Sequence, residues 1–131
     1  MVAHSGKAKV LLVDDEYVIA NTLATIFSNE GYETRAVQSA EAALALLETE
    51  EWVPQLAIID VCLPGMNGIE LAIKVKTQYP GVRMYLFSGR DATAQLLEEA
   101  SKQGHYFEVL PKPVHPAVLL AMASSLLRRG D

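Results

Sequence analysis

Charged and hydroxyl side chains directly follow four apolar segments of this sequence. Asp14 and Asp15 follow the first such segment, and Asp60, Ser88 and Lys112 follow three later ones. Three carboxylates placed together repel one another unless a cation joins them, and Mg²⁺ suits a site with a few carboxylates and retained waters. A lysine beside them adds a positive charge that can hold a phosphoryl oxygen. If these groups meet, Asp60 is placed to attack phosphorus, because positioning and charge neutralisation are most of what phosphoryl transfer requires.

Each of these residues, taken alone, also has a simpler structural interpretation. Asp14 and Asp15 would favour the positive end of a following helix, and Asp60 or Ser88 could begin a turn. Lys112 stands between two prolines and could be a solvated loop residue. The chemistry is therefore predicted for the set, and it requires that the four segments end at one place.

The hydrophobic pattern predicts how those segments are arranged. The stretch before Asp60 is apolar without alternation, as in a strand buried on both faces of a parallel sheet. Segments with helical spacing follow each strand, and Asn67 with Glu70 resembles a capping box, while Asp91 can cap the next helix. Because parallel strands end at the same edge, the polar groups that follow them should converge there. The expected strands are Lys9–Val13, Tyr32–Val37, Leu56–Asp60, Val82–Phe87 and Tyr106–Leu110.

Composition restricts the class of protein and its partners. The chain has 131 residues, half of them apolar, which indicates one folded domain at 8–131 after a flexible segment at 1–7. A net charge of −5 does not favour nucleic acid or anionic membrane, and no apolar run approaches the roughly 20 residues of a membrane span. The N-terminus lacks an apolar signal core, and the single cysteine, Cys62, suits a reducing compartment, so we expect a cytoplasmic protein.

Four segments together resemble the receiver domain of two-component response regulators. The resemblance covers about residues 8 to 128, and its motifs stand in the family's order at close to its spacings. It implies an α/β, flavodoxin-like (βα)5 three-layer sandwich, with a parallel five-stranded sheet of order 2-1-3-4-5. The matching segments are Val10–Glu16, Ile59–Gly68, Phe87–Gly89 and Leu110–Pro113.

The resemblance implies a phosphoacceptor and a metal site. Asp60 would take a phosphoryl group from a histidine kinase or phosphotransfer protein in an Mg²⁺-dependent reaction. Asp15 would bind the ion directly, Asp14 would assist through water, and Asp60 with the backbone carbonyl of Cys62 would complete the protein ligands. Such a domain is not a conventional enzyme, but it catalyses its own phosphorylation and dephosphorylation. The Lys112–Pro113 peptide bond is expected to be cis.

The resemblance also implies a switch. Lys112 would contact the phosphoryl group, and Ser88 would move to hydrogen-bond it. The family usually has an aromatic partner for this switch three positions before the lysine, where this chain has Val109. We hypothesise that Phe107 or Tyr106 replaces that aromatic residue, or that signalling here uses no rotating ring.

The output implied is a change of partner affinity on the face made by the fourth helix, fifth strand and fifth helix. We expect a downstream protein target, no direct nucleic acid binding, no membrane binding, and possible homodimerisation through that face. The chain ends at Asp131, so we expect either a stand-alone regulator or a receiver cut from a longer protein.

Three other functions are alternatives. An aspartyl-phosphate phosphatase would need an acid in place of Cys62, and a flavin-binding protein would need a phosphate-binding loop after the first strand. The third alternative is a module of the same kind that works unphosphorylated.

Overall fold

The sequence folds into five strands that alternate with five helices. A computed structural model describes residues 7–89 and 93–129, so the expected flexibility of residues 1–6 and the expected cap at Asp91 lie outside the described residues. Each strand is followed by a helix, as the hydrophobic pattern predicted. The elements are β1 (Lys9–Val13), α1 (Tyr17–Asn29), β2 (Glu33–Val37), α2 (Ala40–Glu48), β3 (Leu56–Asp60), α3 (Gly68–Gln78), β4 (Arg83–Ser88), α4 (Thr93–Lys102), β5 (Glu108–Pro111) and α5 (Pro116–Arg129).

The five strands form one parallel sheet in the order β2-β1-β3-β4-β5. This is the flavodoxin-like arrangement, and it confirms the predicted strand order of 2-1-3-4-5. The order reverses at β1, and ligands of open α/β sheets bind beside such a reversal, outside the carboxyl ends of the strands. The two acids after β1 and the acid at the end of β3 therefore lie on neighbouring strands.

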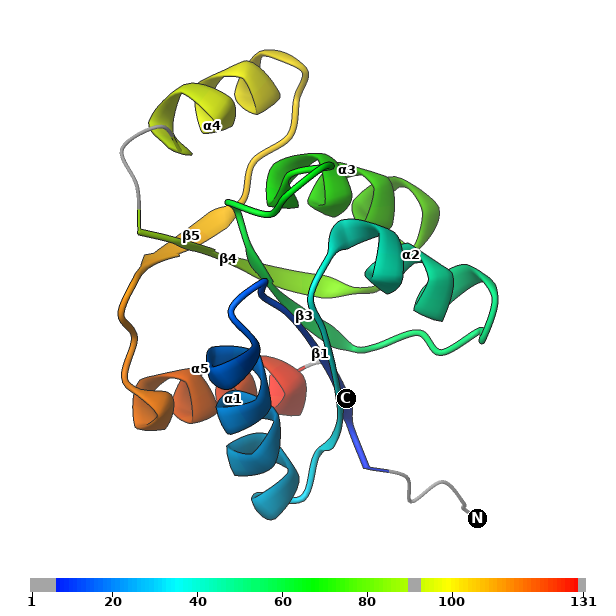
Figure 1. Cartoon of the computed structure of the whole chain (residues 1–131), viewed down its shortest axis with the longest axis vertical. Coiled ribbons are helices and arrows are strands. Elements are labelled where there is room, and N and C mark those ends of the chain that lie inside the picture. The colour runs from blue at the N-terminus through cyan, green and yellow to red at the C-terminus, as the bar shows by residue number, and fades with distance from the viewer. Residues whose placement is uncertain (1–6, 90–92, 130–131) are drawn as a thin grey trace.

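Helices cover both faces of the sheet and give the molecule three layers. α1 and α5 lie on one face, and α2, α3 and α4 lie on the other (Figure 1). On the first face, Phe27 and Leu119 pack against the sheet with the even-numbered residues of β1; on the second, Leu47 and Leu71 pack with the odd-numbered ones. β3, the strand that carries Asp60, is buried along its whole length. Burial of its apolar side chains on both faces of the sheet stabilises its position.

The start of β5 differs from the expected strand. We predicted a strand from Tyr106, but pairing with β4 begins only where Tyr85 faces Glu108. The backbone before it closes the end of α4, because the N–H of His105 donates to the carbonyl of Ala100 at 3.0 Å. Tyr106 therefore lies in the connection between α4 and the sheet, and β-branched or aromatic residue types alone misplaced the boundary.

A capping box fixes the start of α3, as predicted. The Asn67 side chain accepts hydrogen bonds from the backbone N–H groups of Ile69 and Glu70, and the Glu70 carboxylate accepts from the N–H of Asn67. This cap stops the loop after β3 and begins the helix beside the end of that strand. No helix in the described part of the chain is both long and apolar enough to cross a membrane.

Candidate functional site

Asp60 is the last residue of β3, and it is buried. Its two carboxylate oxygens have different partners. The backbone N–H of Cys62 donates to Oδ1 at 3.1 Å, and the Lys112 ammonium donates to Oδ2 at 3.0 Å. These two donors fix the orientation of the carboxylate, which is what a nucleophile needs before its substrate arrives.

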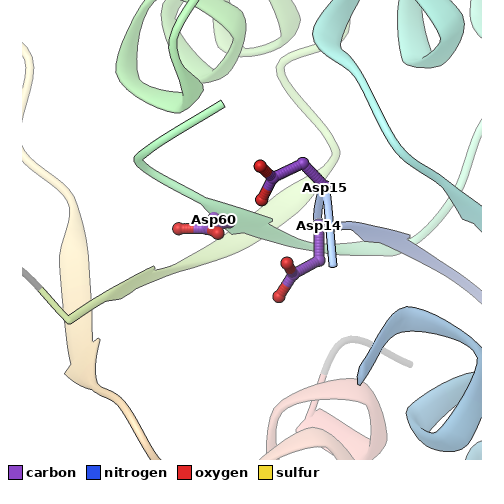
Figure 2. A group of neighbouring side chains, drawn as sticks. All are labelled: Asp14, Asp15 and Asp60. Carbon is purple, nitrogen blue, oxygen red and sulfur yellow. The ribbon is translucent and has the colours of Figure 1, made fainter. Parts of the chain in front are cut away.

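Two further acids stand beside Asp60 at the end of β1. Oxygen atoms of Asp14, Asp15 and Asp60 all lie within 4.8 Å of one another, and Figure 2 shows the three carboxyl groups gathered beyond the ends of β1 and β3. The loop after β1 is held to β2, because the N–H of Asp14 donates to the carbonyl of Val37 at 3.1 Å. The predicted convergence of these acids is confirmed by these distances.

Lys112 reaches the same place from the end of β5. Its backbone N–H donates to the carbonyl of Ser88 at 2.9 Å, which aligns the lysine with the end of β4. Its Nζ lies 3.0 Å from Asp14 Oδ2 and 3.0 Å from Asp60 Oδ2. Burial by itself would lower the pKa of this ammonium, but the contacts with Asp14 and Asp60 outweigh it and raise the pKa, so Lys112 is positively charged at neutral pH.

The pKa of the Asp60 carboxyl is raised above its ordinary value of 3.8. Burial is the largest cause, and the negative charge of Asp14 adds to it. The hydrogen bonds from Lys112 and from the Cys62 N–H act in the opposite direction without overcoming burial. One ammonium shared between buried carboxylates therefore compensates each of them only in part.

The group of acids fits a small divalent cation. Asp14 Oδ2 is buried and, although it is 3.0 Å from the lysine Nζ, it has no hydrogen-bond partner of suitable geometry among the described residues. Such an oxygen keeps coordinating capacity, and three carboxylates carry more negative charge than one ammonium neutralises. Hard oxygen ligands with open space beside them suit Mg²⁺, so the residues present fit the predicted ion.

A cavity of about 340 Å³ opens above these groups. It gives a substrate access to the Asp60 carboxylate, and the side of Lys112 lines it. Gly89 lies beside Lys112 in this wall, where a Cβ on Gly89 would make an ordinary contact at 3.5 Å from the Lys112 Cβ. The residues that line the cavity are Asp15, Glu16, Asp60, Cys62, Gly89 and Lys112.

Ser88 and Cys62 lie where the sequence placed them. Ser88 ends β4 and pairs in register with Pro111, directly before Lys112. Cys62 follows Asp60 in the loop between β3 and α3. This loop is closed by a hydrogen bond in which the N–H of Gly68 donates to the carbonyl of Val61 at 2.9 Å. The Lys112–Pro113 peptide bond is cis, as expected.

The three residues considered for the switch differ in their surroundings. Val109 is partly buried in β5 and packs against the α2–α4 side of the core. Phe107 packs on the same side, and the Lys76 Nζ lies 5.5 Å from the centre of its ring. The Tyr106 side chain is 73% exposed. The Tyr106 ring is therefore exposed, whereas the Phe107 ring packs against the core beside Lys76 of α3.

Sequence reasoning missed two residues of this site. Glu16 Oε1 lies 3.3 Å from the Lys112 Nζ and lines the cavity, yet only its place after two aspartates hinted at this. Gly68 lies against the backbone of Asp60, and its place after the Asn67 cap gave no sign of that contact.

Comparisons with known proteins identify relatives of this fold and site. Residues 10–124 match the family model of the response regulator receiver domain. A solved structure of a response regulator receiver domain protein (CheY-like) from Methanospirillum hungatei JF-1 is 28% identical and superposes with a TM-score of 0.83, covering 95% of this chain and 97% of that one.

Two curated relatives are longer than this chain. The response regulator protein FleR of Pseudomonas aeruginosa is 37% identical over 117 residues, which is 89% of this chain and 24% of FleR. The DNA-binding response regulator MtrA of Mycobacterium leprae is 28% identical over 125 residues, 95% of this chain and 53% of MtrA. The chain thus spans about a quarter to a half of the length of these relatives.

Proposed function

Because this chain belongs to the response regulator receiver domain family, we propose that it accepts a phosphoryl group on Asp60 from a histidine kinase or phosphotransfer protein in the cytoplasm. One observation carries the proposal: a buried carboxylate at the end of β3 has Lys112 at 3.0 Å and belongs to a group of three acids that lie within 4.8 Å of one another. A nucleophile, a fixed positive charge and a cation-binding group are the parts that phosphoryl transfer to a carboxylate requires.

In the proposed reaction an Asp60 oxygen attacks the phosphorus of a phosphohistidine. A P–O bond forms, the P–N bond breaks, and its electron pair stays on the departing imidazole, which takes up a proton. Lys112 neutralises charge that gathers on the phosphoryl oxygens, and the Cys62 N–H keeps the Asp60 carboxylate oriented. The same cavity admits water, so the domain would also catalyse hydrolysis of its own acyl phosphate.

The ligands proposed for Mg²⁺ are Asp15 directly, Asp14 through water, Asp60, and the backbone carbonyl of Cys62. Bound there, the ion would neutralise negative charge shared by the acids and the incoming phosphoryl group. The oxygen of Asp14 that lacks a hydrogen-bond partner among the described residues supports this set. The exposed position of Asp15 at the cavity supports its direct role, because an ion that retains waters needs an open side.

The proposed output is a change of partner affinity on the α4–β5–α5 face, which would bind a downstream protein or a second copy of the chain. Ser88 would move to hydrogen-bond the phosphoryl group, and β5, paired with β4 beside it, would transmit the change. Tyr106 and Val109 are the residues proposed to change position after phosphorylation, because Tyr106 precedes β5 and Val109 lies within it. We do not assign this part to Phe107, whose ring packs under Lys76.

A phosphatase is the alternative enzyme, and it is disfavoured by one position. Aspartyl-phosphate phosphatases use an acid two residues after the nucleophile, and this chain has Cys62 there. A module that works without phosphorylation would have no need of Lys112 in contact with a buried nucleophile.

The proposal is tested with the whole chain, Mg²⁺ and a small phosphodonor such as phosphoramidate, followed by intact mass. We expect one added phosphoryl group, lost in Asp60→Asn and slowed by a chelator. Glu98→Gln, an exposed acid on α4, is the matched control and should react as the unmodified chain does. Turnover of many phosphate esters would favour the phosphatase, and absence of modification at every Mg²⁺ concentration would overturn the proposal.

A further inference from the structure

A third carboxylate contacts Lys112 from outside the group of three aspartates. Glu16 Oε1 lies 3.3 Å from Nζ. Its side chain is 60% exposed, whereas those of Asp14 and Asp60, the other two carboxylates at this ammonium, are 4% and 6% exposed. Among the described residues, Glu16 is not part of the group that could hold a metal ion. Its contact with the lysine therefore stands on the solvent side of the site.

The Glu16 side chain has no other structural task in the described contacts. The residue stands at the N-cap of α1, but its side chain makes no capping hydrogen bond. Its backbone is fixed independently, because its N–H donates to Asp14 Oδ1 at 2.9 Å. A change of the Glu16 carboxylate should therefore alter Lys112 without altering the helix.

We propose that Glu16 is a positioning residue that holds Lys112 in the resting site and competes with an incoming phosphoryl anion for it. This inference rests on the proposed function. An ammonium has three N–H groups, and three carboxylates surround this one. Two of the N–H groups donate to Glu16 Oε1 and Asp60 Oδ2, and Glu16 lines the cavity beside Lys112. A phosphoryl oxygen that reaches the ammonium through the cavity therefore displaces the Glu16 contact.

Glu16 is the partner that is exchanged at least cost. An exposed carboxylate returns to water when it is released, whereas a buried carboxylate left without its cation is strongly disfavoured. Glu16 thus sets how readily the lysine becomes available, and its negative charge at the cavity acts against anions. Removing the contact should make the site bind phosphoryl-like anions more tightly.

The experiment measures the beryllofluoride concentration that half-saturates the full chain in Mg²⁺, followed by backbone amide shifts. Glu16→Gln and Glu16→Ala should lower that concentration about two- to fivefold, the size expected for loss of an exposed charge pair. Glu98→Gln, with the same change of charge on α4, should leave it unchanged. The thermal midpoint of Glu16→Gln should stay within a few degrees of that of the unmodified chain, since its side chain makes no capping hydrogen bond and an exposed charge at a helix N-terminus contributes only about 0.3–1 kcal/mol.

Glu16→Asp separates contact from charge. It keeps the negative charge but shortens the side chain by one methylene, so it should resemble Glu16→Gln if the contact with Lys112 matters. Behaviour like the unmodified chain would mean that only the charge acts, and would overturn the proposal. An unchanged or higher half-saturating concentration in Glu16→Gln would overturn it as well. Failure of the unmodified chain to bind beryllofluoride would instead refute the proposed function itself.

Discussion

Gly68 lies directly against the backbone of Asp60, with no room for a side chain between them. A Cβ added to Gly68 would be 2.8 Å from the carbonyl carbon of Asp60 and 2.8 Å from the Cα of Val61, closer than real Cβ atoms come to other atoms. These neighbours are backbone atoms at the buried end of β3, so no rotation of a side chain could relieve the contact. The first residue of α3 thus defines where the proposed phosphoacceptor sits.

Gly68→Ala is expected to destabilise the protein by about 3 kcal/mol, because overpacking against fixed backbone forces the strand and helix apart. The matched control is Gly81→Ala, since a Cβ at Gly81 meets nothing within 4 Å; its effect should stay within about 0.5 kcal/mol. Urea unfolding measures both variants. Equal stabilities for the two would contradict the close packing of α3 on Asp60.

Lys112→Ala should destabilise the metal-free protein by about 3 kcal/mol, because it leaves the buried carboxylates of Asp14 and Asp60 without their cation. We expect Mg²⁺ to restore more stability to this variant than to the unmodified chain, since the ion supplies the missing positive charge. Urea unfolding with chelator and with Mg²⁺ gives the comparison, and Lys74→Ala, an exposed lysine on α3, is the control. An Mg²⁺ effect no larger than in the unmodified chain would argue against a shared site.

The raised pKa of Asp60 predicts how stability depends on pH without metal. The folded chain holds this proton more tightly than the unfolded chain, whose carboxyl titrates near 3.8. The stabilising contribution is thus complete below that value and is lost as pH rises through the folded pKa. Asp60→Asn stays neutral throughout, and Asp14 and Glu16 still contact Lys112, so the variant should be more stable than the unmodified chain at pH 7.

That advantage of Asp60→Asn should shrink as the pH falls toward the ordinary carboxyl pKa of 3.8, because the raised pKa lets the folded chain protonate Asp60 before the unfolded chain does. Urea unfolding in chelator at several pH values checks the trend, and Glu98→Gln, an exposed acid on α4, serves as the control for loss of one carboxylate. A variant that is less stable at pH 7, or whose difference does not change with pH, would show that burial of the Asp60 charge is not the dominant cost.

The sequence predicted those features that depend on local pattern. The apolar run before Asp60 and the alternation of strands with helices were enough to place the acids and Lys112 at one sheet edge, because parallel strands share their direction. The Asn67 cap was readable from the same stretch, since its partner Glu70 stands three residues on.

The remaining features depend on tertiary contacts that no local pattern reports. Glu16 meets Lys112 across 96 positions of the chain, and its contact depends on side-chain reach rather than on strand order. The start of β5 depends on which residue faces Tyr85, so the aromatic residues Tyr106 and Phe107 suggested a longer strand than forms. Gly68 is explained only by how closely α3 approaches β3.

The central claim is that Asp60 itself becomes phosphorylated, and borohydride trapping tests it most directly. An acyl phosphate is reduced by borohydride to an alcohol, so the chain treated with phosphoramidate and Mg²⁺ and then reduced should carry homoserine in place of aspartate at position 60, located by peptide sequencing in a mass spectrometer. We expect reduction at Asp60 alone. No reduction should occur when the phosphodonor is omitted and Mg²⁺ is kept. Reduction at Asp14 or Asp15 instead, or phosphoryl transfer to another residue with Asp60 unmodified, would contradict the account.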